Sequence, residues 1–258
     1  TAPSHVAMCK DLISKTQVAY VLVEKPISTS VNQGRSLQSL IKERAWQGSI
    51  GVDFVKRGSR MYQDIRDLTH SGEMGGLVEA VYSRVVKTSM KGAHEFDFMN
   101  WVVGAPPIQV TADLEGISHT DHRGSKFFDP VGQVEIEYQS GARFILDGRR
   151  ELQGYEEGMT MKFERGEIFV DVDETFAVIR DGKGQRLIHS DKVGAGLNWF
   201  INVLDVLERE SNPGTPCTLD EAITGLGILV GAHVSSADGG SRVSLPLNSE
   251  LWAEELRI

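Results

Sequence analysis

Cysteine and long apolar runs are both scarce in this chain. Its 258 residues include only Cys9 and Cys217, which lie far apart and match no metal-ligand spacing. They predict two free thiols in a reducing cytoplasm and no metal site. No apolar stretch reaches the length that spans a bilayer, and the first residues lack the pattern of a signal peptide. These absences predict a cytoplasmic protein without a disulfide framework.

Basic runs are also absent. Lysine and arginine total 27, against 36 aspartates and glutamates, so the net charge is −9. A chain without a positive patch is a poor partner for nucleic acid or an anionic membrane, and we expect neither. Apolar residues make up 40% and charged residues 24%, as in an ordinary globular protein. The length allows one large domain or two smaller ones.

The stretch from Tyr20 to Pro26 organises the first part of the chain. Tyr20 to Val23 is apolar without alternation, which predicts a parallel strand buried on both faces. Pro26 cannot donate to a strand ladder and therefore forces a turn after Lys25. Open α/β sheets bind ligands at the carboxyl ends of their strands. We therefore expect Lys25 at a ligand site, although a lysine at a strand end is by itself more often a surface residue.

Helices and strands alternate up to about residue 57 and then give way to a different pattern. The expected elements are helices over 6–13 and 28–45 with a second strand over 49–55. Beyond them we expect helices over 59–71 and 94–103, a strand over 77–87, seven strands from 108 to 190, and closing helices over 197–208 and 219–235. Strands joined by short Gly-containing turns indicate a mostly antiparallel sheet.

Five motifs occur in order along the chain. They are Thr1-Ala2-Pro3-Ser4-His5, Glu24-Lys25-Pro26, His94-Glu95-Phe96-Asp97 with Trp101 and Gly104, Gly154-Tyr155-Glu156 and Asp238-Gly239-Gly240. Each motif alone is weak, but their order and spacing resemble the Gfo/Idh/MocA family of sugar and polyol dehydrogenases. The resemblance covers essentially the whole chain, and the E-K-P motif is its most specific part.

The resemblance implies an α/β plus α+β fold. Residues 1–57 would form the C-terminal part of a Rossmann-type parallel sheet, which binds a dinucleotide. Residues 58–258 would form a mostly antiparallel open-sheet domain with helices on one face, for substrate binding and oligomerisation. The implied cofactor is NAD or NADP, and the implied cofactor-binding residues are Thr1, Pro3, His5, Glu24, Lys25 and Pro26.

The implied reaction moves a hydride between the cofactor and a hydroxyl or keto carbon of a sugar, sugar nucleotide or polyol. Such a reaction needs a group that stabilises charge on the oxygen and a group that moves its proton. Lys25 and His94 are the predicted catalytic residues. An imidazole suits proton transfer near neutral pH, and the start of a helix favours its neutral form.

Lys91, Asp97, Tyr155 and Arg84 are the predicted substrate-binding residues. Asp97 is equally suited to anchoring its helix, and Tyr155, Arg84 and Arg57 belong to types that more often pack or lie on the surface. Many family members carry an acid four positions before the histidine, where this chain has Met90. That difference leaves open a Lys/His mechanism or a lost activity. The alternatives are a non-catalytic relative that binds sugar or cofactor, and an NAD-dependent glycosidase of the same family.

The family's glycine-rich G-x-G-x-x-G/A loop has no counterpart in the sequence. Either a segment precedes residue 1 in the whole protein or the protein lacks this loop. An incomplete sheet would expose large apolar faces, which favours the first alternative. Without a grip on the pyrophosphate, residues 1–258 alone are expected to turn over no substrate.

Several predicted strands have apolar residues at both odd and even positions, and therefore on both faces of the sheet. Residues 144–146 and 168–170 are examples. A sheet that is apolar on both faces needs a second covering layer. We therefore predict a homodimer or homotetramer through the open sheet.

Overall fold

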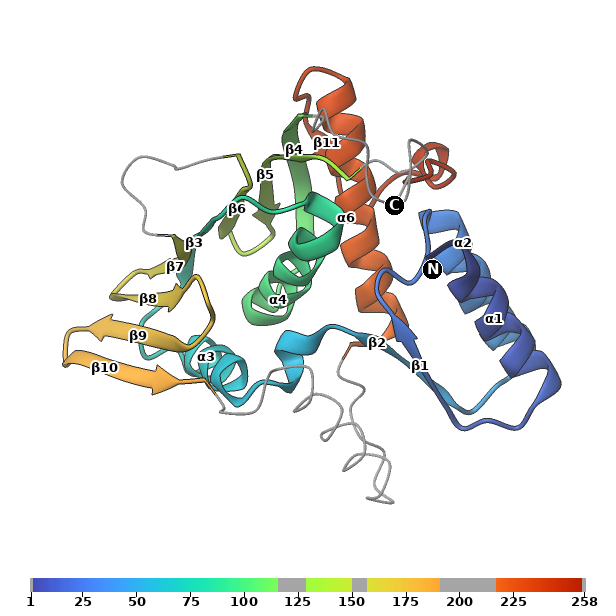
Figure 1. The fold of residues 1–258 in the computed structure, drawn as a ribbon, viewed down its shortest axis with the longest axis horizontal. Coiled ribbons are helices and arrows are strands. Elements are labelled where there is room, and N and C mark those ends of the chain that lie inside the picture. The colour runs from blue at the N-terminus through green and yellow to red at the C-terminus, as the bar shows by residue number, and fades with distance from the viewer. Residues whose placement is uncertain (1, 116–128, 150–156, 191–216, 257–258) are drawn as a thin grey trace.

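The computed structural model describes residues 2–115, 129–149, 157–190 and 217–256 (Figure 1). Its first part consists of α1 (Ala2–Lys15), β1 (Tyr20–Glu24), α2 (Val31–Glu43) and β2 (Ser49–Asp53). The strands β1 and β2 pair in parallel, with Glu24 opposite Asp53 at their carboxyl ends. The side chain of Ser30 accepts a hydrogen bond from the Gln33 N–H and caps α2, as the sequence predicts. The predicted α/β alternation is therefore confirmed.

One prediction about β1 is wrong. Val21 and Val23 are buried, but Leu22, between them, is 38% exposed. The strand is therefore buried on one face rather than on both. Among the described residues β1 pairs only with β2, and the side of β1 that carries Leu22 is left open.

A nine-stranded sheet forms the larger part of the fold. Its order is β10-β9-β8-β7-β3-β6-β5-β4-β11, and every neighbouring pair is antiparallel except β3 and β6. The strands are β3 (Leu77–Ser83), β4 (Pro107–Glu115), β5 (Val131–Tyr138), β6 (Arg143–Asp147), β7 (Gly158–Phe163), β8 (Gly166–Asp171), β9 (Phe176–Asp181), β10 (Gly184–His189) and β11 (Val243–Ser244). The predicted mostly antiparallel sheet is confirmed. The strand that begins at Leu77 ends at Ser83, four residues earlier than predicted.

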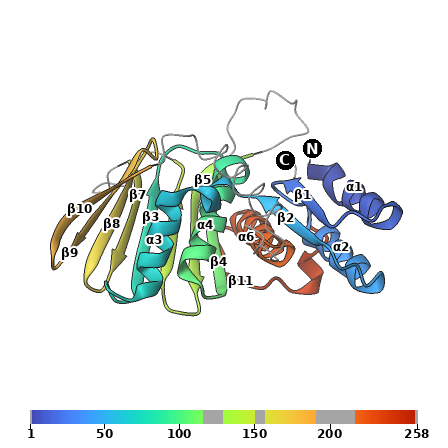
Figure 2. The same ribbon diagram turned by 90° about the horizontal axis from the view of Figure 1, so that it is seen from below.

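Helices α3 (Arg60–Ser71), α4 (Ala93–Val103) and α6 (Leu219–Ala237) lie on one side of this sheet (Figure 2). Their apolar faces and the inward strand residues form one core, in which Phe96 of α4 meets Phe144 of β6 edge to face. The expectation of helices on one face is confirmed. The predicted helix over 197–208 lies outside the described residues. Short helical turns η1 (Val55–Gly58), η2 (Thr88–Gly92, π-helical) and η3 (Ser249–Leu251) complete the fold.

The opposite face of the sheet is mixed rather than apolar. Val81, Phe169 and Val178 lie in one cross-strand row outside the main core, and all three are buried. Beside that row, Arg143 pairs with Glu79 and Glu135 across strands. The face therefore has an apolar centre and a charged border.

Helix α6 joins the two parts of the fold. Thr218, at its start, bridges Gly51 of β2, and the Val52 N–H donates to the Cys217 carbonyl. A capping box between Thr218 and Glu221 fixes the first turn of this helix, which begins at Leu219 as predicted. Farther along, a side chain at Gly231 would meet Val110 Cγ1 at 2.7 Å, so glycine is needed there for close packing. The end of the chain returns to the first part, where the Leu256 N–H donates to Thr29.

Within the described residues, no helix is long and apolar enough to cross a membrane. The same residues contain no group of three or more His, Cys, Asp or Glu side chains arranged to hold a metal ion. Both cysteines are free and buried.

Candidate functional site

Lys25 lies at the carboxyl edge of the parallel strands, where the sequence places it. It follows Glu24 at the end of β1, and Asp53 ends the neighbouring strand. The Lys25 ammonium donates a hydrogen bond to the carbonyl of Met90, in the π-helical turn before α4. The turn after β1 is thereby joined to the start of α4, 65 residues later in the chain.

The electrostatics around Lys25 are divided. Burial lowers its pKa, whereas Asp129, Glu24 and Asp53 act in the opposite direction. Asp53 responds similarly: burial and the nearby Glu24 raise its pKa to about 6, against the effect of Lys25. One carboxylate oxygen of Asp53 is buried without a hydrogen-bond partner. Lys25 and Asp53 are therefore both shifted toward their neutral forms.

Asp129 is a site residue that the sequence did not reveal. It is buried, and its carboxylate accepts a hydrogen bond of 2.7 Å from the Ser89 N–H. Ser89 precedes Met90, whose carbonyl receives the Lys25 ammonium, so Asp129 holds the turn to which Lys25 is bound. Asp129 is distant from every motif in the chain, and no spacing signal points to it.

His94 lies in the first turn of α4, beside Phe54, with the two ring centroids 5.7 Å apart. Its Nδ1 is buried and has no hydrogen-bond partner. Burial, followed by the charges of Lys25 and Lys56, lowers the pKa of His94 to about 3. The sequence predicts that the helix start favours the neutral imidazole, but burial is the largest cause of the lowered pKa. His94 is therefore uncharged at neutral pH and is a weak base.

A buried ionic cluster lies next to His94. The Lys56 Nζ donates to Glu95 Oε2 at 2.8 Å and to the Tyr62 hydroxyl at 3.0 Å. It also lies 3.3 Å from Glu174 Oε1, and Lys91 Nζ lies 3.2 Å from the same oxygen. Burial would lower the pKa of Lys56, but Glu95 and Glu174 outweigh it and raise the pKa. The predicted substrate residue Lys91 is thus brought to the site with Lys56, Glu95 and Glu174, none of which was predicted for a site role.

Glu174 reaches this cluster from the turn between β8 and β9. Its backbone is left-handed, with φ of 59°, which is uncommon for a residue other than glycine. The Asp171 carboxylate accepts hydrogen bonds from Thr175 N–H at 2.6 Å and Phe176 N–H at 2.7 Å, which fixes the turn. Arg84, predicted to bind substrate, donates to the Val172 carbonyl at 2.7 Å and holds the same turn.

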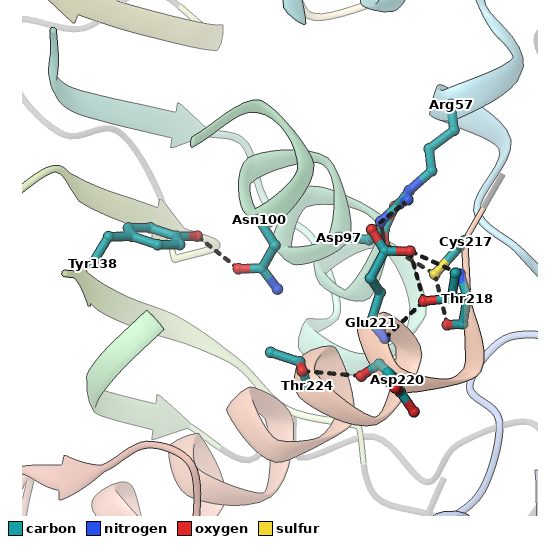
Figure 3. A network of polar contacts seen from close by, with 9 residues as sticks. All are labelled: Arg57, Asp97, Asn100, Tyr138, Cys217, Thr218, Asp220, Glu221 and Thr224. Carbon is teal, nitrogen blue, oxygen red and sulfur yellow. Dashed lines mark hydrogen bonds and ion pairs between the residues drawn. The ribbon is translucent and has the colours of Figure 1, made fainter. Parts of the chain in front are cut away.

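Asp97 belongs to a separate network, shown in Figure 3. Its two carboxylate oxygens accept hydrogen bonds from Arg57 Nε at 2.8 Å and Nη2 at 2.7 Å. Arg57 also pairs with Glu221 of α6 at 2.9 Å, and the Cys217 thiol contacts Asp97 at 3.4 Å. Asp97 is buried and bound to Arg57 through both oxygens, which ties α4 to η1, and its predicted role in substrate binding stays a prediction.

The remaining predicted cofactor residues lie around the start of α1. Pro3 is exposed in the first turn, and His5 Nδ1 lies 2.9 Å from the Pro26 carbonyl. This contact ties α1 to the turn that carries Lys25. Thr1 and Tyr155 lie outside the described residues.

No family model matches this chain. The inositol 2-dehydrogenase of Corynebacterium glutamicum is 25% identical over 183 residues, which cover 66% of this chain and 53% of that protein. The chain therefore spans about half the length of the curated relatives it matches.

Solved oxidoreductases share the fold over almost the whole chain. One, from Agrobacterium radiobacter, was solved with NAD⁺, L-tartaric acid and magnesium; the match has a TM-score of 0.75 at 15% identity and covers 95% of this chain and 78% of that one. Another is the WlbA dehydrogenase from Bordetella pertussis, solved with NADH and UDP-GlcNAcA, at a TM-score of 0.68 and 18% identity, covering 96% of this chain and 77% of that one. The fold is therefore that of known oxidoreductases.

The residues at the edge of β1 and β2 fit one end of a dinucleotide. Lys25 and the unpartnered Asp53 oxygen supply polar groups at the carboxyl ends of parallel strands, where such folds bind their ligands. The sequence contains no glycine-rich loop for the pyrophosphate.

Proposed function

We propose that this protein is an oxidoreductase that transfers a hydride between NAD or NADP and a hydroxyl or keto carbon of a sugar or polyol. The observation that carries the proposal is the meeting of Lys25 with the start of α4, where its ammonium binds the Met90 carbonyl in the turn that leads to His94. The relative that acts on inositol and the solved neighbours that bind NAD⁺ or NADH support it.

NAD or NADP, when bound, supplies the hydride chemistry. Glu24, Lys25 and Pro26 would contact it at the strand edge, with Pro3 and His5 at the start of α1. Lys25 moves the substrate proton, and burial, which lowers its pKa, shifts it in the direction that a general base needs. In the reverse direction its ammonium stabilises the forming alkoxide and returns the proton. Neutral His94 orients the substrate hydroxyl by a hydrogen bond.

The test is NADH formation by the whole protein on a panel of sugars and polyols, compared with Lys25→Ala. Loss of the charge and proton carrier is expected to lower kcat by about 10²–10³-fold. Lys15→Ala is the matched control, because Lys15 is exposed and pairs with the exposed Asp11, one turn earlier in α1. An unchanged rate in Lys25→Ala would remove Lys25 from the mechanism.

A second candidate is a non-catalytic relative that binds a sugar or the cofactor. Met90 favours it, because this residue has no side chain that transfers a proton. Calorimetric binding of NADH without turnover on any member of the panel would support this candidate over the first.

We also infer a cytoplasmic homodimer or homotetramer that associates through the open face of the nine-stranded sheet. Leu187, which is 54% exposed and lies beside Val178 on that face, supports it. Light scattering of the purified protein tests it, and a monomer at micromolar concentration would contradict it.

A further inference from the structure

The Lys56 cluster has a closed part and an open part. The side chains of Lys56 and Glu95 are 4% and 0% exposed, whereas those of Lys91 and Glu174 are 35% and 24% exposed. In the closed part, Lys56 meets Glu95 Oε2 at 2.8 Å. Lys91 and Glu174 are the members of the cluster that a ligand can reach from solvent.

The backbone at Glu174 argues against a purely passive counter-ion. In the described part of the chain, only Ala45 and Glu174 have a positive φ without being glycine. Such positions persist only where the surroundings impose them, and they gather at binding and catalytic sites. The Asp171 side chain and the Arg84 contact impose the conformation here, and they direct Glu174 at Lys91.

The charge of Glu174 is fixed over the physiological range. Burial would raise the pKa of Glu174, but Lys56 and Lys91 outweigh it and lower the pKa to about 2. Glu174 is therefore an acceptor only. The Lys91 ammonium is a donor only. Both groups lie beside His94, on which their charges act.

We propose that the Lys91–Glu174 pair binds two neighbouring hydroxyl groups of the substrate, with Lys91 donating to one and Glu174 accepting from the other. Glu174 is then a specificity-determining residue contributed by the β8–β9 turn. A hydroxyl both donates and accepts, so a vicinal diol satisfies an adjacent donor and acceptor together. This inference rests on the proposed function and adds to it a residue, Glu174, that selects for two neighbouring hydroxyl groups. A monohydroxy alcohol leaves one member of the pair unsatisfied and binds more weakly.

The experiment compares wild type with Glu174→Asn and Glu174→Gln. Both substitutions remove the negative charge of Glu174. Asparagine tolerates the left-handed backbone conformation, whereas glutamine keeps the size of the glutamate side chain and the backbone strain. Ala45→Asn is the matched control, because it places the same residue type at the other left-handed position, just beyond α2 and exposed.

Binding is measured by saturation-transfer NMR without cofactor, with myo-inositol as the vicinal polyol and cyclohexanol as the monohydroxy probe. Wild type and Ala45→Asn are expected to bind myo-inositol, and both Glu174 variants at least about tenfold more weakly. Cyclohexanol binding is expected to be the same in all four proteins.

Equal myo-inositol binding by wild type and Glu174→Asn would overturn the inference, as would its absence in wild type. Thermal unfolding separates a structural role: a Tm lowered in both Glu174 variants with unchanged inositol binding would make Glu174 a structural counter-ion. Because no turnover is measured, intact inositol binding without NADH formation contradicts the proposed function and leaves this inference standing.

Discussion

Two ionic networks lie along α4, and they differ in how completely their polar groups are paired. In the Arg57 network both Asp97 oxygens are bonded to the guanidinium, and Glu221 is shared between Arg57 and the α6 cap. In the site that carries Lys25, by contrast, several buried polar atoms have no partner among the described residues. They are Asp53 Oδ1, Tyr82 Oη, His94 Nδ1 and Glu95 Oε1.

The difference separates a structural network from a site. A buried polar group without a partner costs free energy, so native proteins leave few of them, and each one calls for a physical explanation. The Arg57 network fixes α4 against β2 and α6 and needs nothing further. The Lys25 site keeps unpaired donors and acceptors together with a strained backbone at Glu174, a combination that a substrate and cofactor could satisfy.

Breaking the complete network has the largest expected effect. Arg57→Met leaves the buried Asp97 carboxylate without its bidentate partner and is expected to lower the free energy of unfolding by about 3–5 kcal/mol. Urea denaturation measures it. Arg60→Met is the control, since Arg60 forms an exposed i,i+4 pair with Asp64 and should change stability by less than about 1 kcal/mol. Equal losses in the two variants would refute the distinction between the networks.

Asp53 tests the incomplete network through pH. Its pKa in the folded protein is raised to about 6, above its unfolded value, so its protonated form stabilises the fold and that contribution is lost as pH rises from about 4 to 6. Asp53→Asn removes this loss. After allowance for solvent screening, the variant is expected to be about 1 kcal/mol more stable than wild type at pH 7 and equal to it at pH 4. Urea denaturation of both proteins at pH 7 and pH 4 measures these stabilities. A stability difference that is the same at both pH values would contradict the raised pKa of Asp53.

Asp129 gives the smallest expected effect, on the reactivity of Lys25. Its charge opposes the lowering of the Lys25 pKa by burial, so Asp129→Asn should lower that pKa further and speed acylation of Lys25 at pH 8 several-fold. Peptide mass spectrometry after a short exposure to acetic anhydride measures it. Lys15 in the same digest is the internal control. A slower reaction at Lys25 in the variant would show that Asp129 acts by packing alone.

Local signals were sufficient to predict most of the fold. The Ser30 cap, Gly72 after α3 and the Thr218–Glu221 box each mark a helix end by chemistry within a few residues, and the structure has all three. Alternating apolar residues and short turns predicted the antiparallel sheet for the same reason. The error at Leu22 arose because burial of a strand's second face depends on whether chain distant in sequence packs on it, and no local pattern reports that packing.

The sequence by itself determined where Lys25 and His94 lie on their elements, because strand ends and helix starts are set by neighbouring residues. Only the tertiary structure decided that Asp97 anchors α4 through Arg57, 40 residues away, and that Asp129 and Glu174 join the site. These partners come from separate turns and strands, and their charges interact only after the sheet and helices have packed. Coulomb energy and burial depend on distance in space, which sequence spacing does not encode.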